Sequence, residues 1–151
     1  MLGLDVFNEK KVSELMIPSE KVAHVHMNNP LEHAMLVLIK SGYSAIPVVD
    51  SEFMLKGLIS MSLILDSILG IERIEVERLE NKVVEDVMNR DIPIIQENDS
   101  LLKGLKLSID YPFLCVVNEE GVFTGILTRR AILKHINRNI YEMNRESVRP
   151  T

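Results

Sequence analysis

Two adjacent arginines near the end of the sequence offer the clearest binding chemistry in the chain. They lie in the run GILTRRAILKHI (125–136), where an apolar stretch typical of a strand gives way at Thr128 to a helical pattern. Threonine is a favoured helix N-cap, so Arg129 and Arg130 are expected in the first helical turn, where cations oppose the helix dipole. A bound anion would reverse this effect, because free N–H groups and guanidinium forks both bind phosphate oxygens. Two interpretations follow: a phosphate or phosphodiester ligand, or two solvated surface charges.

The histidines, the cysteine and the serines form no recognisable metal-binding or catalytic arrangement in the sequence. His24, His26 and His33 lie close together in the sequence, but no Cys, Asp or Glu completes a set at metal-ligand spacing. Cys115 stands within the apolar run FLCVV, which favours a buried, inert thiol. The sequence has no Ser-His-Asp or Cys-His arrangement and no glycine-rich phosphate loop. We therefore predict that the protein is not an enzyme and needs no metal or cofactor.

The composition of the chain limits the structural class of the protein and the kinds of partner that it could bind. The chain has 151 residues, 46% of them hydrophobic and 26% charged, which describes a globular protein of one domain or two small lobes. A net charge of −5 argues against nucleic acid or an anionic membrane as the partner. The longest weakly charged stretch, 57–71, contains Asp66 and is too short to span a bilayer. We expect a soluble, cytoplasmic protein.

An internal repeat organises the sequence. The block NNPLEHAMLVLIKSGYSAIPVVD (28–50) parallels ENDSLLKGLKLSIDYPFLCVVN (97–118), with an offset of 68 residues between their tyrosines. The same offset relates GLIS (57–60) to GILT (125–128). A constant offset through two blocks indicates two copies of one structural unit. A weaker match relates VSELMI to VEDVMN, residues 12–17 and 84–89.

Each unit predicts the same succession of elements. After a short helix comes a turn and a second helix, which in the first unit has apolar residues at helical spacing and ends at Gly42 in a left-handed cap. Two strands and a closing helix follow; the first unit has them at 45–50, 55–60 and 62–70. In the second unit the strands are expected at 113–118 and 122–128, with the closing helix starting at Arg129. A charged connector separates the units.

At this point the units resemble CBS domains (cystathionine β-synthase domains) in the order of elements, in strands ending PVVD or VVN, and in the Gly-apolar-apolar-Thr/Ser step before the closing helix. The resemblance implies an α/β fold: a tandem pair of βαββα-type repeats with pseudo-two-fold symmetry, clefts between the repeats, and a disc-like homodimer. We place the first repeat at 7–70, a connecting helix or linker at 71–82, the second repeat at 83–140 and a polar, frayed C-terminal tail at 141–151.

The resemblance also implies a ligand site, and it favours the phosphate interpretation of the arginines. The cleft is expected to contain Thr128, Arg129 and Arg130 from the second repeat, and Lys21 from the first repeat would add a cation. Val22 and Ala23 would offer an apolar wall and backbone groups to an adenine edge. The entrance to the first strand would add Tyr43, Ser44, Ala45 and Pro47, although a run such as AIPVV also describes an ordinary buried strand.

The two repeats differ at this site, and both depart from a common family pattern. The first repeat has Ser60-Met61-Ser62 where the second has the arginines, so we expect one strong anion site per chain. CBS domains that bind AMP or ATP often have an Asp for the ribose hydroxyls, where this sequence has Leu63 and Ala131. This disfavours an AMP or ATP sensor and favours a ligand whose ribose hydroxyls are partly esterified.

Together, EKVAHV, the 31–50 block, GIERIE and GILTRR resemble the cyclic-di-AMP-binding protein B family of Firmicutes over nearly the whole chain. That resemblance implies a homodimeric cyclic di-AMP receptor whose ligand-free form binds the (p)ppGpp synthetase/hydrolase; pyruvate carboxylase is a further target type in the family. The alternatives are a CBS sensor of AMP, ATP or S-adenosylmethionine, and a ligand-independent dimeric interaction module.

Overall fold

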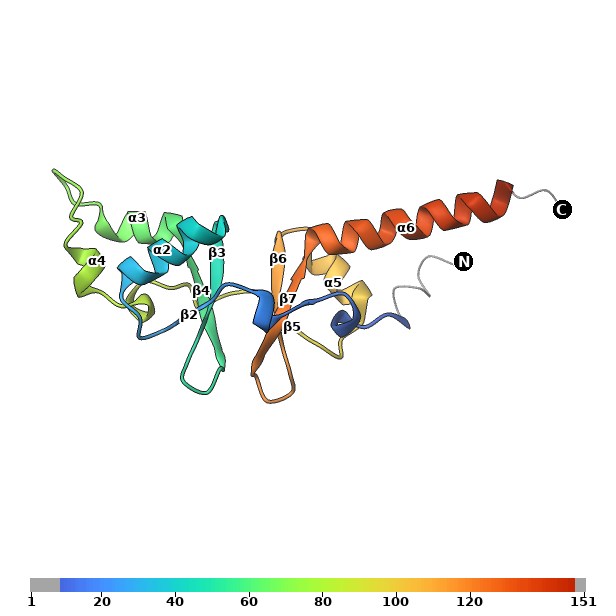
Figure 1. Ribbon diagram of the computed structural model, residues 1–151, viewed down its shortest axis with the longest axis horizontal. Coiled ribbons are helices and arrows are strands. Elements are labelled where there is room, and N and C mark those ends of the chain that lie inside the picture. Colours follow the sequence, from blue (N-terminus) through green and yellow to red (C-terminus); the bar gives the residue numbers. More distant parts are fainter. Residues whose placement is uncertain (1–8, 149–151) are drawn as a thin grey trace.

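The two sequence repeats fold as two similar α/β lobes that lie side by side (Figure 1). The computed structural model describes residues 9–148. One lobe has a three-stranded sheet in the order β2-β3-β4, and the other a four-stranded sheet in the order β1-β7-β6-β5. The strand bounds are β1 (Ile17–Pro18), β2 (Val25–His26), β3 (Ala45–Val49), β4 (Leu55–Ser60), β5 (Ile94–Gln96), β6 (Phe113–Val117) and β7 (Phe123–Thr128).

Equivalent strands pair alike in the two lobes. β2 runs parallel to β3, as β5 does to β6, whereas β3–β4 and β6–β7 are antiparallel hairpins. Both hairpin turns are held by a side chain at the same place: Asp50 accepts N–H groups of Glu52 and Met54, and Asn118 accepts those of Glu120 and Val122. The predicted α/β class and pair of repeats are confirmed.

Helices cover the sheets on the upper side in Figure 1. The predicted second helix of the first unit is present as α2, and Gly42 caps it in the left-handed region with φ 77°, as expected. The expected short helices that begin each unit are single 3₁₀ turns. The helices are η1 (Val12–Glu14), η2 (Ser19–Lys21), α2 (Leu31–Ser41), α3 (Met61–Ile68), α4 (Arg78–Asn81), η3 (Val84–Asp86), α5 (Leu101–Leu107) and α6 (Arg129–Val148).

Each lobe is completed by the segment that begins the other repeat in the sequence. β1 pairs with β7, and Val12 packs into the core of the second lobe. In the same way, Val84 packs into the core of the first lobe, and Asn89 bridges to Leu58 of β4. The two repeats are therefore interlocked in space.

A third apolar cluster joins the two lobes. It consists of buried residues from both repeats, with further partly buried side chains around them. Val22 and Val49 come from the first repeat, and Phe123 and Ile126 come from the second, so the cluster packs one repeat against the other. The buried members are Val22, Val49, Phe123 and Ile126.

The C-terminal helix is longer than expected. The polar segment from residue 141, predicted as a frayed tail, continues α6 to Val148. No break separates it from the second repeat, because a helix already nucleated at a capped N-terminus extends one residue at a time at little cost. Residues 149–151 of the predicted tail, like residues 7 and 8 of the predicted first repeat, lie outside the described residues. Among the helices of residues 9–148, none is long and apolar enough to cross a membrane.

Candidate functional site

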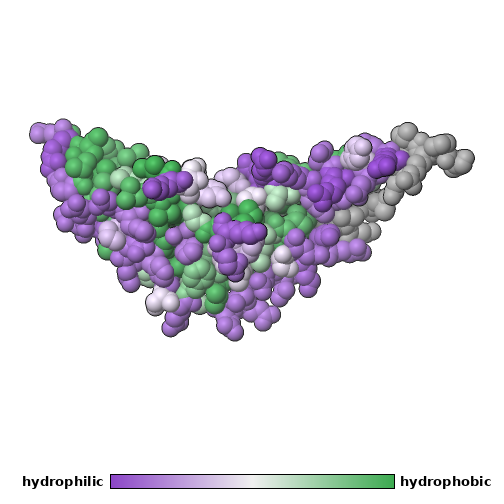
Figure 2. Space-filling view, in the orientation of Figure 1, coloured by the Kyte–Doolittle hydropathy of each residue, from purple (hydrophilic) through white to green (hydrophobic). Residues whose placement is uncertain are grey.

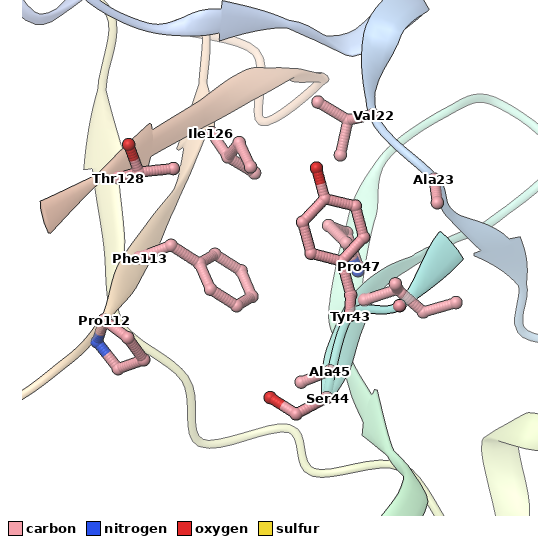
Figure 3. A pocket seen from close by; sticks show the side chains of 12 residues that line it. Val22, Ala23, Tyr43, Ser44, Ala45, Pro47, Pro112, Phe113, Ile126 and Thr128 are labelled. Atoms are coloured by element: carbon pink, nitrogen blue, oxygen red, sulfur yellow. The ribbon is translucent and has the colours of Figure 1, made fainter. Parts of the chain in front are cut away.

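A cavity of about 350 Å³ lies at the junction of the two repeats (Figure 3). It brings together seven of the residues predicted from the sequence, from three separate segments of the chain. These are Val22, Ala23, Tyr43, Ser44, Ala45, Pro47 and Thr128.

Local chain geometry explains how the first repeat supplies one wall. The left-handed cap at Gly42 ends α2 and turns the chain so that Tyr43 and Ser44 stand exposed at the entrance of β3. The carbonyl of Ser44 accepts the N–H of Met61 at 3.1 Å, which ties this entrance to the start of α3. This backbone hydrogen bond holds the entrance of β3 against the first residue of α3.

The second repeat supplies the facing wall. Pro112 and Phe113 lie at the entrance of β6, and the carbonyl of Pro112 accepts the N–H of Arg129 at 2.9 Å, as Ser44 does for Met61. Figure 3 shows the ring of Tyr43 from the first repeat and the ring of Phe113 from the second repeat, both at the cavity. Two aromatic faces at a mostly apolar cavity suit a flat heterocycle.

Sequence reasoning missed five lining residues. Pro112 and Phe113 are the repeat counterparts of Ser44 and Ala45, so the 68-residue offset could have identified them. The symmetry of the repeats places equivalent strand entrances on both sides of the junction. The full set missed is Gly42, Ile46, Pro112, Phe113 and Ile126.

Thr128 caps α6 as predicted. The N–H of Ala131 donates to its hydroxyl oxygen at 3.0 Å, and Ser60 accepts the N–H of Leu63 at 3.2 Å at the start of α3. Since Thr128 also lines the cavity, the N-terminal end of α6 lies at the site. The dipole of a twenty-residue helix favours an anion at this end.

The two arginines that follow have different surroundings. Arg129 is half-buried, and its Nε donates to the carbonyl of Ser108 at 2.7 Å and its Nη2 to that of Ile109 at 3.4 Å. It thereby satisfies carbonyls at the C-terminal end of α5, where a cation is favoured. Arg130 is exposed, and no hydrogen bond or ion pair holds its guanidinium among residues 9–148. The structure thus separates the expected guanidinium pair into one structural and one available group.

Lys21 also stands apart from the cavity wall. It is the last residue of η2, is exposed, and immediately precedes the lining residue Val22. Neither Lys21 nor the arginines are among the residues that line the cavity, so all three cations belong to its surroundings.

The structure shows the surroundings of the histidine and cysteine residues that were considered for metal or thiol chemistry. Within the described part of the chain, no group of three or more His, Cys, Asp or Glu could hold a metal ion. His24 donates from Nδ1 to the carbonyl of Val22 at 3.0 Å. Burial in β6 raises the pKa of the Cys115 thiol to about 12, so it stays protonated and unreactive at neutral pH.

Comparison with known proteins identifies the family to which this architecture belongs. The CBS-domain model matches residues 12–70 and 84–138, which is most of the chain. The chain belongs to the CBS-domain family. It forms a CBS pair, as the sequence resemblance predicted.

Close relatives of this CBS pair share nearly its whole length. It is 49% identical over 144 residues to the cyclic di-AMP receptor B of Bacillus subtilis, covering 95% of this chain and 98% of that protein. The CbpB protein of Listeria monocytogenes, solved in complex with cyclic di-AMP, is 53% identical, with a TM-score of 0.80 over 86% of this chain and 97% of its own. A second CbpB structure in complex with cyclic di-AMP is 30% identical, with a TM-score of 0.85 over 95% of each chain.

Proposed function

We propose that this CBS pair is a cytoplasmic receptor that binds cyclic di-AMP at the junction cavity and regulates a partner protein. The observation that carries the proposal is the cavity itself, an aromatic and apolar space beside the N-terminal end of α6. Two relatives solved with cyclic di-AMP, and a receptor for it with 49% identity, support the choice of nucleotide.

Each lining group has a role in this proposal. An adenine base stacks between Tyr43 and Phe113, and the backbone of Val22 and Ala23 binds its edge. The hydroxyls of Ser44 and Thr128 bind ribose or phosphate oxygens. Because the cavity is at the lower end of the ~300–1,000 Å³ typical of ligand sites, the rest of a dinucleotide extends out of it.

Charge around the cavity favours a phosphodiester. Lys21 directly precedes the lining residue Val22, and Arg130 follows the lining residue Thr128 by two positions. Both side chains are exposed and supply phosphate contacts as the ligand leaves the cavity. Ala131 stands where an Asp would bind a ribose diol, and it cannot accept a hydrogen bond through its side chain. A cyclic dinucleotide has one hydroxyl of each ribose esterified and needs such an acceptor less.

The regulatory part of the proposal rests on the family resemblance. The ligand-free homodimer binds the (p)ppGpp synthetase/hydrolase, and cyclic di-AMP blocks that contact; pyruvate carboxylase is a second candidate partner. Such a switch requires the nucleotide to bind one arrangement of the two repeats better than another. The proposal assigns no catalytic step to the chain.

Calorimetry and thermal shift with cyclic di-AMP, cyclic di-GMP, AMP, ATP and S-adenosylmethionine test the ligand. We expect binding of cyclic di-AMP, with stabilisation of about 2.7 kcal/mol at 100 times its Kd. Arg130→Ala should weaken binding about tenfold or more, through loss of a charge-assisted contact, and Lys134→Ala on the same helix serves as the matched control. A preference for AMP, ATP or S-adenosylmethionine would contradict the assignment of cyclic di-AMP as the ligand. A response to none of the five compounds would overturn the receptor proposal.

A further inference from the structure

A second cavity borders the segment that lines the nucleotide site. It measures about 600 Å³ and lies where the loops joining β3 to β4 and β6 to β7 run side by side at the lower edge of Figure 1. Backbone hydrogen bonds join these loops. The N–H of Leu55 donates to the carbonyl of Gly121 at 3.2 Å, and the N–H of Phe123 donates to the carbonyl of Phe53 at 2.9 Å. We call this cavity the hairpin groove; its lining is Met16, Pro18, Ser19, Glu20, His24, Phe53, Val122, Phe123 and Thr124.

Aromatic rings from both repeats form the apolar part of the hairpin groove. The ring centroids of Phe53 and Phe123 are 5.8 Å apart, and the His24 ring meets Phe53 edge-on at 5.1 Å. Phe123 is buried, while Phe53 is partly exposed. A partner side chain can therefore reach the Phe53 ring.

The backbone at Phe53 is unusual. Its φ is 64°, in the left-handed region, whereas its counterpart in the second repeat is Gly121 with φ 88°. The left-handed region is unfavourable for a bulky side chain and easy for glycine. The first repeat thus has Phe53 at a backbone position where the second repeat has glycine, which adopts this conformation without strain. Retention of a strained aromatic residue here agrees with a role for the Phe53 ring in contacting a partner.

Carboxylates surround the hairpin groove. Glu20 lines it and is exposed, and Glu52, Glu119 and Glu120 are exposed on the two adjoining loops. Figure 2 shows hydrophilic residues along this lower edge, with more hydrophobic surface just above.

Few cations offset these carboxylates. Lys56 is engaged by Asp50 at 3.6 Å. Lys21 is exposed and stands between Glu20, which lines the hairpin groove, and Val22, which lines the nucleotide cavity; Lys21 itself lines neither. The hairpin groove therefore joins aromatic faces to negative charge, a combination complementary to a guanidinium or ammonium group.

We propose that the hairpin groove docks a basic, extended segment of the regulated partner protein. An arginine or lysine side chain lies over Phe53, with its charge beside Glu20. This deepens the proposed function and rests on it, because it names where a regulated partner would bind.

The chain between the two cavities provides the coupling. Within residues 19–24, Val22 and Ala23 line the nucleotide cavity, while Ser19, Glu20 and His24 line the hairpin groove. His24 is bonded to the carbonyl of Val22 at 3.0 Å, so a shift of Val22 is transmitted to the groove. A nucleotide that contacts Val22 and Ala23 thereby changes the surface that the partner binds.

Fluorescence anisotropy with a labelled decapeptide of alternating arginine and alanine tests the groove on the full-length, nucleotide-free protein. We expect saturable binding that weakens with salt and is absent for the matched glutamate–alanine peptide. Glu20→Gln and Phe53→Asn should each weaken binding at least threefold, and Asn tolerates the left-handed backbone. Glu32→Gln, an exposed carboxylate on α2, should leave binding unchanged.

Equal losses in Glu20→Gln and Glu32→Gln would mean attraction to overall charge only and would overturn the groove, as would unchanged binding in Glu20→Gln and Phe53→Asn. Calorimetry of cyclic di-AMP on Glu20→Gln separates the two proposals. Normal nucleotide binding without a peptide site would overturn the groove alone, and failure to bind nucleotide in the wild type would overturn the receptor. Addition of cyclic di-AMP should lower the affinity for the arginine peptide, and an unchanged affinity would contradict the coupling.

Discussion

Arg129 and Arg130 adjoin in the sequence, yet their side chains have opposite roles. The Arg129 guanidinium satisfies the carbonyls of Ser108 and Ile109 after α5, whereas Arg130 is exposed to solvent two residues after Thr128, which lines the junction cavity. Successive helical residues point about 100° apart, so only one of two neighbours can turn toward α5. The separation gives a clear experimental contrast between stability and ligand binding.

Arg129→Ala should destabilise the fold by roughly 1–2 kcal/mol, because two carbonyls lose a charged donor in a half-buried place. Urea unfolding measures this free energy, and Arg130→Ala is the natural control, with a change expected within ~0.5 kcal/mol. The reverse order of the two variants in stability would contradict this division of roles between the arginines.

At the scale of elements, two glycines allow the lobes to interlock. A Cβ at Gly57 would lie 2.6 Å from the carbonyl oxygen of Asn89, and a Cβ at Gly125 would collide with that of Ile17. These are the positions where the segment that begins each repeat pairs with the sheet of the other lobe. The glycine of GLIS and GILT is therefore required by a close backbone approach, and neither needs a positive φ.

Gly125→Ala should destabilise the protein by about 1–3 kcal/mol, since β1 must move away from β7 to admit the methyl group. Gly57→Ala should act similarly through Asn89. Thermal unfolding followed by circular dichroism measures both, with Ser51→Ala in the exposed hairpin as control. A Tm within a degree of the wild type for Gly125→Ala would show that β1 and β7 can separate at little cost.

At the scale of the whole molecule, the helices leave an apolar surface uncovered. Figure 2 shows it as the hydrophobic region on the upper left, over α2 and α3. Ile39 of α2 is 60% exposed and Leu65 of α3 is 48% exposed. α6 adds Leu133 and Ile140, both more than half exposed. Exposed apolar side chains on these helices are candidates for burial against a second copy, which is where we expect the predicted homodimer to form.

Leu65→Glu should weaken dimer formation by placing a charge in that apolar contact. Light scattering coupled to size exclusion, over a dilution series, should show the wild type at twice the chain mass and the variant shifted toward one chain. Ile94→Glu on the edge strand β5, where Ile94 is 46% exposed, serves as control and should remain dimeric. A monomeric wild type would contradict the homodimer.

Much of the fold could be predicted because it rests on local chemistry and on internal symmetry. Strand β4 was predicted with its observed bounds, the left-handed cap at Gly42 is present, and Thr128 caps α6. Turn residues, alternating apolar residues and caps act over a few positions, and the second repeat shows the same strand pairing and the same N-cap at its closing helix. The same symmetry explains why seven of the expected site residues lie around one cavity.

The amino-acid sequence thus specified the paired repeats, most of their elements and seven of the residues that line the junction cavity. The tertiary structure decided which lobe each crossing segment completes, which carbonyls Arg129 satisfies, and that Phe53 and Phe123 meet beside Glu20. These features depend on contacts between residues tens of positions apart, and no local pattern encodes which distant partner a backbone edge or a guanidinium will meet. The distant partner of each backbone edge and each guanidinium is fixed only when the two lobes pack together.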